Sequence, residues 1–462
     1  MRFIRTLLRP FVRALIAAFY GVWRAQIRLK AFIPEKREAW MSRARQAYFR
    51  FHAGRWNGER IGRNAHGRDV AMLVVSDLRV DPRVEREARA LADAGYRVRV
   101  LCPDLTNGAV LTQPLNWGAG VKFDFLPVSA AAFVMEKPGY LGAEMYFWAR
   151  RLRPFAFHAH DLNTCYVALA AARETGAHLI ADFHEWSSEN VHWDFETARL
   201  ETYSGAWKEE LRALEARVLR EASATITVSE SIVDAIAAEL GGGKRPALVR
   251  NIPSLSAVPT RHYPPLKQQL GLPPDRFVLL WQGGTGPTRL IEPIIEALAF
   301  APKCTFVIRG PSLDMFGTEY MDIARHAGAE DRLILLPPVP SRDVVAAARG
   351  ADAGIWTLPA LCRNFTFALP NKIFEYMASE LPTLVAHHPE ASRMVTRYQT
   401  GLIFDPYDPR SIAAAINRLI EEPGLADALR ANTTAALGEL DAGREWQRLV
   451  DIYDRLPRTG VV

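Results

Sequence analysis

From residue 69 onward, short apolar runs alternate with longer stretches in which apolar residues recur every three or four positions. The short runs predict buried strands, and the longer stretches predict amphipathic helices. A first series of strands is expected at 70–75, 97–101, 155–158, 179–183 and 224–228. Helices are expected between them at 82–94, 163–175 and 207–221. Strands that alternate with helices in this way form parallel sheets with helices on both faces.

A second series follows a proline-rich segment at 253–274. Its strands are expected at 278–281, 305–309, 333–336, 353–356, 382–386 and 402–404. Helices are expected between them, and three more near the end at 408–421, 423–437 and 443–455. The pattern predicts an α/β protein with two Rossmann-like parallel-sheet domains, 69–250 and 276–440, joined by a linker at 251–275. The segment 441–462 is expected to form a C-terminal helix that packs back toward the first domain. Ligands of such sheets bind beyond the carboxyl ends of the strands, so a cleft between the domains is expected.

Composition agrees with this division. The length of 462 residues exceeds what one hydrophobic core usually supports. A hydrophobic fraction of 49% and a charged fraction of 23% are typical of globular proteins. The four cysteines are scattered without paired spacing, which argues against a disulfide framework or a structural zinc site and fits a reducing compartment.

Positive charge is concentrated in an N-terminal extension, residues 1–68, which holds 16 Lys and Arg against 3 acidic residues. The rest of the chain holds 41 against 48, so its acidic balance argues against a nucleic-acid binder. Within the extension, an apolar stretch at 14–23 is flanked by arginines and lacks a small-residue cleavage site after it. We expect residues 1–30 to form a helix on an anionic membrane surface, which would make the protein peripheral on the cytoplasmic face of the cell membrane. The alternatives are a basic helix docked on the body or an RNA-binding tail; five aromatic anchors favour the membrane, namely Phe11, Phe19, Tyr20, Trp23 and Phe32.

The stretch 369–378 carries the most informative local pattern. Pro370 suits the first position of a helix, and the polar residues Asn371, Lys372 and Glu375 are spaced so that they share one neighbourhood. A cation in the first turn is unfavourable beside the helix dipole unless an anion, such as a diphosphate, occupies the same place. The alternative is a solvated Lys and Glu on a surface helix.

A glycine-rich turn at 281–289 follows a predicted strand. Gly283 and Gly284 would let backbone N–H groups approach a phosphate, and Arg289 could form paired hydrogen bonds with diphosphate oxygens. The turn matches neither a dinucleotide-binding fingerprint nor a P-loop, so a plain strand–helix connection remains the alternative.

Polar residues also follow two neighbouring strands of the first domain. His160 and Asp161 end one strand, and His184 and Glu185 end the next. We expect these groups to contact an acceptor or a sugar hydroxyl, with Asp161 as a helix cap as the alternative. A metal is not expected, because no further cluster has ligand spacing.

Two arginines follow the first strand. Arg79 and Arg83 are expected to face an anionic acceptor. The same segment reads as a helix start, with Asp81 as N-cap and Pro82 at the first helical position, and both interpretations are expected to hold.

Taken in order, these pieces resemble the retaining glycosyltransferases of family four, which have the two-domain GT-B fold. The resemblance covers residues 69–440 and rests on 81–88 with Leu91 and Gly95, 158–163, 182–185, 226–230, 282–284 and 368–378. It implies a nucleotide-diphosphate sugar donor bound by the second domain, an acceptor bound by the first, and no metal or other cofactor.

The resemblance also implies roles for single residues. Glu375 would bind the donor ribose, Arg289 the diphosphate with help from Lys372, and His160 would lie near the donor sugar. Two positions depart from the family pattern. A glutamate is usual where this chain has Phe367, and a basic residue is usual where it has Gly284. Asn364 is a candidate substitute for the missing contacts, which makes the expected donor site Gly283, Gly284, Arg289, Asn364, Pro370, Asn371, Lys372 and Glu375.

The resemblance therefore implies retaining glycosyl transfer to a glycan or lipid-linked glycan, as in polysaccharide biosynthesis. His160, Asp161, Arg289 and Lys372 are the expected catalytic residues; Arg79, Arg83, His184 and Glu185 are the expected acceptor-binding residues. Two alternatives stay open. One is an epimerase or hydrolase of nucleotide sugars with the same fold, and the other is a catalytically weak partner in a polysaccharide assembly complex.

Overall fold

The computed structural model describes residues 67–79, 81–104, 115–126, 143–194, 199–240, 244–253 and 259–458. All of them belong to one compact unit, Trp56–Val462. The basic extension, and with it the expected membrane-binding helix at 1–30, lies outside the described residues. Among the helices that are described, none combines the length and the apolar composition needed to cross a membrane.

The first domain is built on a seven-stranded parallel sheet with the strand order β3-β2-β1-β4-β5-β8-β9. Its strands are β1 (Asp69–Leu73), β2 (Arg97–Pro103), β3 (Val121–Leu126), β4 (Ala156–His160), β5 (His178–Phe183), β8 (Ala224–Thr227) and β9 (Ala247–Leu248). Its helices are α3 (Pro82–Asp93), α5 (Ala143–Leu152), α6 (Asp161–Thr175), α7 (Gly205–Glu221) and α8 (Glu230–Glu239). A separate antiparallel hairpin, β6 (Val191–Asp194) and β7 (Arg199–Thr202), follows the end of β5.

The second domain repeats the plan with six parallel strands in the order β12-β11-β10-β13-β14-β15. They are β10 (Phe277–Gln282), β11 (Cys304–Arg309), β12 (Leu333–Leu336), β13 (Ala353–Trp356), β14 (Thr383–Ala386) and β15 (Gly401–Phe404). The helices are α9 (Leu266–Gln269), α10 (Glu292–Glu296), α11 (Leu313–His326), α12 (Val344–Ala348), α13 (Arg363–Thr366), α14 (Asn371–Ala378), α15 (Pro389–Tyr398), α16 (Pro409–Glu421) and α17 (Leu425–Glu439).

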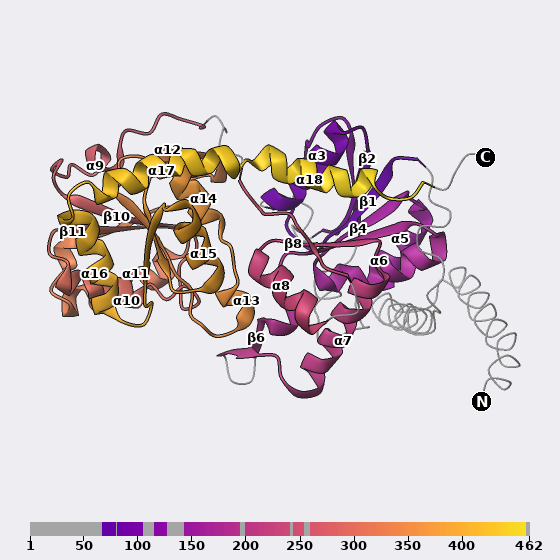
Figure 1. The fold of residues 1–462 in the computed structure, drawn as a ribbon, viewed down its shortest axis with the longest axis horizontal. Helices are drawn as coiled ribbons and strands as arrows, with labels where there is room; N and C mark the ends of the chain where they lie inside the picture. Colours follow the sequence, from indigo (N-terminus) through magenta and orange to yellow (C-terminus); the bar gives the residue numbers. More distant parts are fainter. Residues whose placement is uncertain are drawn as a thin grey trace, which may run out of the picture. The chain divides into compact units, whose positions relative to one another are not determined.

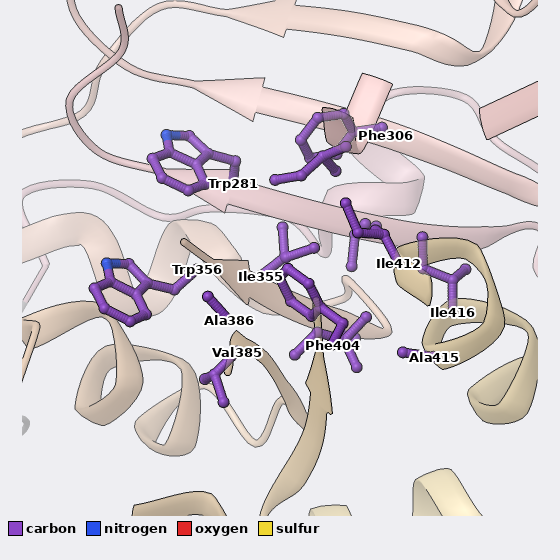
Figure 2. Packing of buried hydrophobic residues seen from close by; sticks show 14 of the residues in the cluster. Trp281, Phe306, Ile355, Trp356, Val385, Ala386, Phe404, Ile412, Ala415 and Ile416 are labelled. Carbon is purple, nitrogen blue, oxygen red and sulfur yellow. The ribbon is translucent and has the colours of Figure 1, made fainter. Parts of the chain in front are cut away.

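The core of the second domain explains why these segments are strands. β10 and β11 are buried at all six of their positions, as expected for central parallel strands covered on both faces. Figure 2 shows Trp281 and Phe306 from these strands packed with Phe404 of β15 and Ile412 of α16. Helix α16 buries one stripe at helical spacing and leaves the opposite face polar.

The predicted fold class, two Rossmann-like parallel-sheet domains, is confirmed. Each strand predicted from an apolar run is present within a few residues of its expected bounds. The sequence pattern missed β3, β9 and the β6–β7 hairpin. β3 lies at the edge of its sheet and alternates apolar and charged residues, so it has no continuous apolar run.

The chain crosses between the domains a second time at its C-terminal end. α17 packs against α14 of the second domain, and the next helix, α18 (Ala442–Asp454), packs against α3 of the first (Figure 1). Leu449, Val450 and Tyr453 of α18 join the buried core of the first domain. The first domain thus takes part of its core from the far end of the chain.

A buried carboxylate joins the domains directly. Glu390, in the first turn of α15, accepts hydrogen bonds from the backbone N–H groups of Glu230 at 3.1 Å and Ser231 at 2.9 Å, and from the Ser231 hydroxyl at 2.8 Å. These N–H groups lie at the start of α8, where the helix dipole favours an anion. Glu390 therefore caps a helix of the other domain.

Replacing Glu390 with Ala should lower stability by about 2 kcal/mol, because it leaves buried N–H groups unpaired. That loss corresponds to a fall in Tm of about 4–8 °C for a domain of this size, measurable by scanning calorimetry. The control is Arg397→Gln on the same helix, whose exposed side chain makes a long ion pair with Glu230 at 3.8 Å and lies over the ring of Tyr398. Equal Tm values for the two variants would show that Glu390 does not hold the domains together.

Candidate active site

A cleft of about 1710 Å³ separates the two domains. One wall is formed by α3 and the residues before it, including Arg79 and Arg86. The other wall is formed by the carboxyl ends of β10 and β11 and by the first turn of α14, including Lys372 and Glu375. This is the place where ligands bind to sheets of this kind.

The start of α14 differs by one residue from the prediction. The helix begins at Asn371, and Pro370 is the N-cap residue with extended backbone, not the first helical residue. A proline side chain has no oxygen to accept a hydrogen bond, and no side chain caps this end of the helix. Ile373, Phe374 and Met377 are buried and fix the helix to the sheet. The cleft therefore meets a rigidly held helix end with an uncapped first turn, which favours anion binding.

Lys372 reaches from this first turn to the glycine-rich turn. A Cβ placed on Gly283 would lie 2.6 Å from Cε of Lys372 and 2.7 Å from its Nζ, and Gly283 has a φ of 132°. Only glycine combines this backbone conformation with so close a side chain. The structure thus brings together the two segments that the sequence analysis assigned to a diphosphate.

Arg289 provides a second cation in the same place. A Cβ on Gly284 would lie 3.3 Å from Nε of Arg289, so the absence of a side chain at 284 makes room for the guanidinium. Neither Arg289 nor Lys372 has an ion-pair partner within 4.0 Å among the described residues. Burial, together with the charge of Arg289, lowers the pKa of Lys372 to about 8, although Glu375 opposes the shift.

Glu375 faces the cleft one turn further along α14. Burial raises the pKa of its carboxyl group, and the nearby charges of Lys372 and Arg86 oppose that shift. Arg86 comes from α3 of the other domain, where its guanidinium donates a 2.6 Å hydrogen bond to Asn251 and lies over the ring of Trp446. The carboxylate therefore lies between cations of both domains.

The strand ends of the first domain form a histidine cluster. His160 Nδ1 lies 3.1 Å from His184 Nε2, which lies 2.8 Å from an oxygen of Asp182. Burial disfavours charge on His184, but Asp161 and Asp182 outweigh it and raise its pKa to about 9. His160 is buried, does not line the cleft, and has an Nε2 atom without a hydrogen-bond partner. A buried ring nitrogen in this state is available to a substrate hydroxyl that reaches it.

The prediction that Arg83 faces an anionic acceptor is wrong. Arg83 is 3% exposed and donates two hydrogen bonds to Asp182, at 2.7 and 3.0 Å, and its Nη2 lies 3.0 Å from Glu87. The capping interpretation of the same segment is confirmed, since Asp81 accepts the N–H of Val84. Arg83 and Glu87 are four residues apart on the buried face of α3, and this spacing was the signal that could have revealed the pair.

Arg79 lines the cleft, but its guanidinium is paired with Asp77 at 2.6 Å. Asp161 opens α6 with a φ of 64° and makes no side-chain cap, so its predicted alternative role as a helix cap is not observed. Instead its carboxylate lies 3.5 Å from Nδ1 of His184. Glu185 is exposed, accepts a hydrogen bond from Asn190, and is near enough to Arg289 for each to affect the pKa of the other.

Asn364 and Phe367 lie at a contact between the domains. Asn364 Oδ1 accepts the backbone N–H of Trp186 at 2.8 Å. The guanidinium of Arg363 lies 4.4 Å from the ring centroid of Trp186 and 5.3 Å from that of Phe367. Phe367 therefore packs toward the loop that follows Glu185, and the oxygen of Asn364 is engaged in the same contact.

One group of side chains has the composition of a metal site. Atoms of Glu87, His158, His160 and Asp182 lie within 4.8 Å of one another. The sequence analysis missed this grouping because Glu87 comes from α3, far from the strands in sequence. The guanidinium of Arg83 lies 3.0 Å from Glu87 and 2.7 Å from Asp182, so these residues form a buried network of ion pairs. The absence of a catalytic metal stays a prediction.

Comparison with known proteins agrees with this architecture. Residues 80–252 match the family described as "Glycosyl transferase 4-like domain", and residues 263–436 match "Glycosyl transferases group 1". Similar solved structures include sucrose-phosphate synthase from Thermosynechococcus elongatus, with 16% identity, a TM-score of 0.67 and coverage of 84% of this chain and 99% of that one. Anabaena HepE in complex with UDP and glucose has 18% identity, a TM-score of 0.63 and coverage of 84% and 100%. The two domains therefore have the GT-B fold.

The chain is also similar in sequence to curated glycosyltransferases. D-inositol 3-phosphate glycosyltransferase of Streptosporangium roseum is 25% identical over 40% of this chain and 44% of its own length. The enzyme of the same name from Acidothermus cellulolyticus is 30% identical over 34% and 36%. Each is thus matched over less than half of its length. Together with the two family matches, these similarities show that the chain belongs to the glycosyltransferases of family four.

The lowered pKa of Lys372 can be tested without a ligand. In competitive labelling with acetic anhydride, read by mass spectrometry, the amine should titrate near pH 8 and not near its ordinary value of 10.5. Arg289→Gln should raise this pKa because it removes a repelling charge, and Glu375→Gln should lower it because it removes an attracting one. Lys303, on the surface, serves as the internal reference. Titration near 10.5 would mean that Lys372 is hydrated and not enclosed by the site.

Proposed function

We propose that the protein transfers a sugar from a nucleotide-diphosphate sugar to an acceptor hydroxyl with retention of configuration. The observation that carries the proposal is the pair Lys372 and Arg289 at the uncapped start of α14, two neighbouring cations with no carboxylate within 4.0 Å among the described residues. Such a site is unfavourable when empty and favourable around a diphosphate. Membership in family four supports the same reading.

In this proposal the donor lies along the second domain. The diphosphate binds between Lys372, Arg289 and the first-turn N–H groups of α14, and Glu375 accepts the ribose hydroxyls. As the bond to the sugar breaks, negative charge grows on the leaving diphosphate. The two cations are already in place and stabilise that charge without reorganisation.

The acceptor would approach from the first domain. Glu185 of the first domain lies near Arg289 of the second. In the first domain, the buried Nε2 atom of His160 has no hydrogen-bond partner and could receive one from the acceptor or the sugar. Arg79, Asp161 and His184 complete the predicted acceptor and active-site groups on this side. Asp182 is held by Arg83 and by histidines, so this carboxylate is not free to act as a nucleophile. Retention is therefore proposed to proceed without a covalent glycosyl-enzyme.

UDP-sugars are the first donors to test, because HepE, with the same fold, was crystallised with UDP. The curated relatives act on D-inositol 3-phosphate by name, so phosphorylated cyclitols belong in the acceptor panel beside glycans and lipid-linked glycans. Products that form without any acceptor would favour the alternative of a nucleotide-sugar epimerase or hydrolase. A folded protein that binds no nucleotide diphosphate in calorimetry would favour the non-catalytic partner.

Arg289→Ala and Glu375→Ala should each reduce turnover by about 10²–10³, the usual effect of removing one charge-stabilising group. The rate of nucleotide release from the donor found in the panel gives the measurement, and circular dichroism checks folding. The matched control is Arg325→Ala, which removes a surface arginine of the same domain that is paired only with Asp322 and Glu330. Wild-type rates from Arg289→Ala or Glu375→Ala would contradict the site.

The N-terminal extension is proposed to hold the enzyme at an anionic membrane, close to a lipid-linked acceptor. The support is the charge pattern of residues 1–68 and the aromatic residues among them. The full chain should sediment with vesicles containing anionic lipid at low salt and be released at high salt, because screening weakens surface attraction. A chain starting at residue 67 should stay in the supernatant. Failure of the full chain to sediment would remove this part of the proposal.

A further inference from the structure

Three aromatic rings form a buried column beneath the proposed active site. His158 and His160 are two residues apart on β4 and so point to the same face of the strand. Their rings stack at a centroid distance of 4.5 Å with an interplanar angle of 26°. The ring of Tyr453 continues the column at 6.1 Å from His158 and 14° from its plane. All three side chains are essentially inaccessible to solvent.

Tyr453 also holds His158 by a hydrogen bond. Its hydroxyl lies 2.8 Å from Nδ1 of His158, while Nε2 of His158 lies 3.1 Å from Glu87 and 3.8 Å from Asp182. The hydroxyl can donate to a neutral ring and accept from a charged one, so the bond persists in either protonation state. Tyr453 thus provides the hydrogen bond on Nδ1 of His158, while Nε2 lies near two carboxylates without a hydrogen bond, and the face of the ring supports His160.

The hydroxyl group comes from a distant part of the chain. Tyr453 lies on α18, the helix that returns to the first domain after α17. α17 packs against α14, which carries Lys372 and Glu375, and α18 packs against α3. A continuous path of packed elements therefore joins the start of the donor helix to the column under His160.

We propose that Tyr453 is a positioning residue for His160, acting through His158, so that the C-terminal helix sets the geometry of the active-site histidine. The role of His160 rests on the proposed function; the link from Tyr453 to its ring does not. His160 has no hydrogen-bond partner on Nε2, and its Nδ1 lies 3.1 Å from His184 and 3.4 Å from Asp182, so the stacked face of His158 is a further contact that orients the ring.

Removal of the Tyr453 hydroxyl would leave a buried nitrogen of His158 without a partner. A buried polar group in this state is costly, and the ring lowers the cost by tilting or by changing its protonation. Either response alters the surface on which His160 stacks. The groups that face His158 and set its charge are Glu87 and Arg83 of α3, Asp182 of β5, His160 of β4 and Tyr453 of α18.

The chain offers a closely matched control. Tyr96 of the first domain donates a 2.7 Å hydrogen bond to Asp454 of α18, one residue from Tyr453, and the two tyrosine rings touch edge to face. Tyr96→Phe therefore removes a hydroxyl that ties α18 to the same domain, while it keeps the ring contact with Tyr453 and the hydrogen bond from Tyr453 to His158. Any general loosening of α18 should affect both variants.

The experiment compares the full chain with Tyr453→Phe and Tyr96→Phe, using ¹⁵N-histidine NMR, UDP calorimetry and UDP release from UDP-glucose. Tyr453→Phe should move the ring-nitrogen signals of His158 and His160 and reduce turnover about tenfold, while the Kd for UDP changes less than about twofold. Tyr96→Phe should leave the His160 signals and the turnover at wild-type values. Unchanged His160 signals in Tyr453→Phe would overturn the inference.

A double-mutant cycle with His158→Asn tests whether Tyr453 acts on His160 through His158. If Tyr453 acts through His158, adding Tyr453→Phe to His158→Asn should produce no further change at His160, whereas independent effects would add. Additive effects would overturn the route, and His158→Asn by itself tests the column if Tyr453→Phe does not fold. If the wild type releases no UDP from UDP-glucose, the proposed function fails for that donor, while the histidine signals still decide the inference.

Discussion

Two like charges held side by side are the central constraint on this molecule. Lys372 and Arg289 lie against Gly283 and Gly284, where any residue with a side chain would crowd the two cations. Each is partly buried, and burial lowers the pKa of both. Cations are normally enclosed only with a compensating anion. Since the described residues offer none within ion-pair distance, the compensation is expected from a ligand, and the GT-B fold and family four say what kind of ligand to try first.

In the first domain, by contrast, the buried charges are carboxylates, and they are paired with cations of the same domain. Asp182 and Glu87 are fully buried carboxylates, and Arg83 lies between them with His158 and His184 alongside. These charged groups lie in direct contact in a buried volume, so breaking one pair would leave an uncompensated buried charge. The same network fixes the ring that borders the proposed acceptor side. The second domain therefore leaves two cations without an ion-pair partner among the described residues, whereas the buried network of the first domain pairs its charges internally.

Much of this could be predicted from the sequence, for a clear physical reason. Central parallel strands such as β10 and β11 are apolar throughout, so they are visible without any structure. The helix at the start of which Lys372 lies was predicted from the sequence to within one residue, and the closeness of Lys372 to Gly283 was expected because both segments were assigned to one diphosphate. Edge strand β3 was not visible because its exposed face is polar. Arg83 was misread because an arginine four residues before a glutamate looks the same on a solvated face as on a buried one. Tyr453 could not be connected to His158 at all, since nothing local records a contact across nearly three hundred positions.

The return of α18 to the first domain has a consequence for biosynthesis. Leu449, Val450 and Tyr453 complete a core whose other residues begin at Val70. During synthesis the ribosome releases the early sheet long before it releases these side chains. The apolar surface under α3 therefore stays uncovered until the second domain has been made, so the nascent first domain is expected to need protection by a chaperone. A helix translated after the second domain thus completes the core of the first.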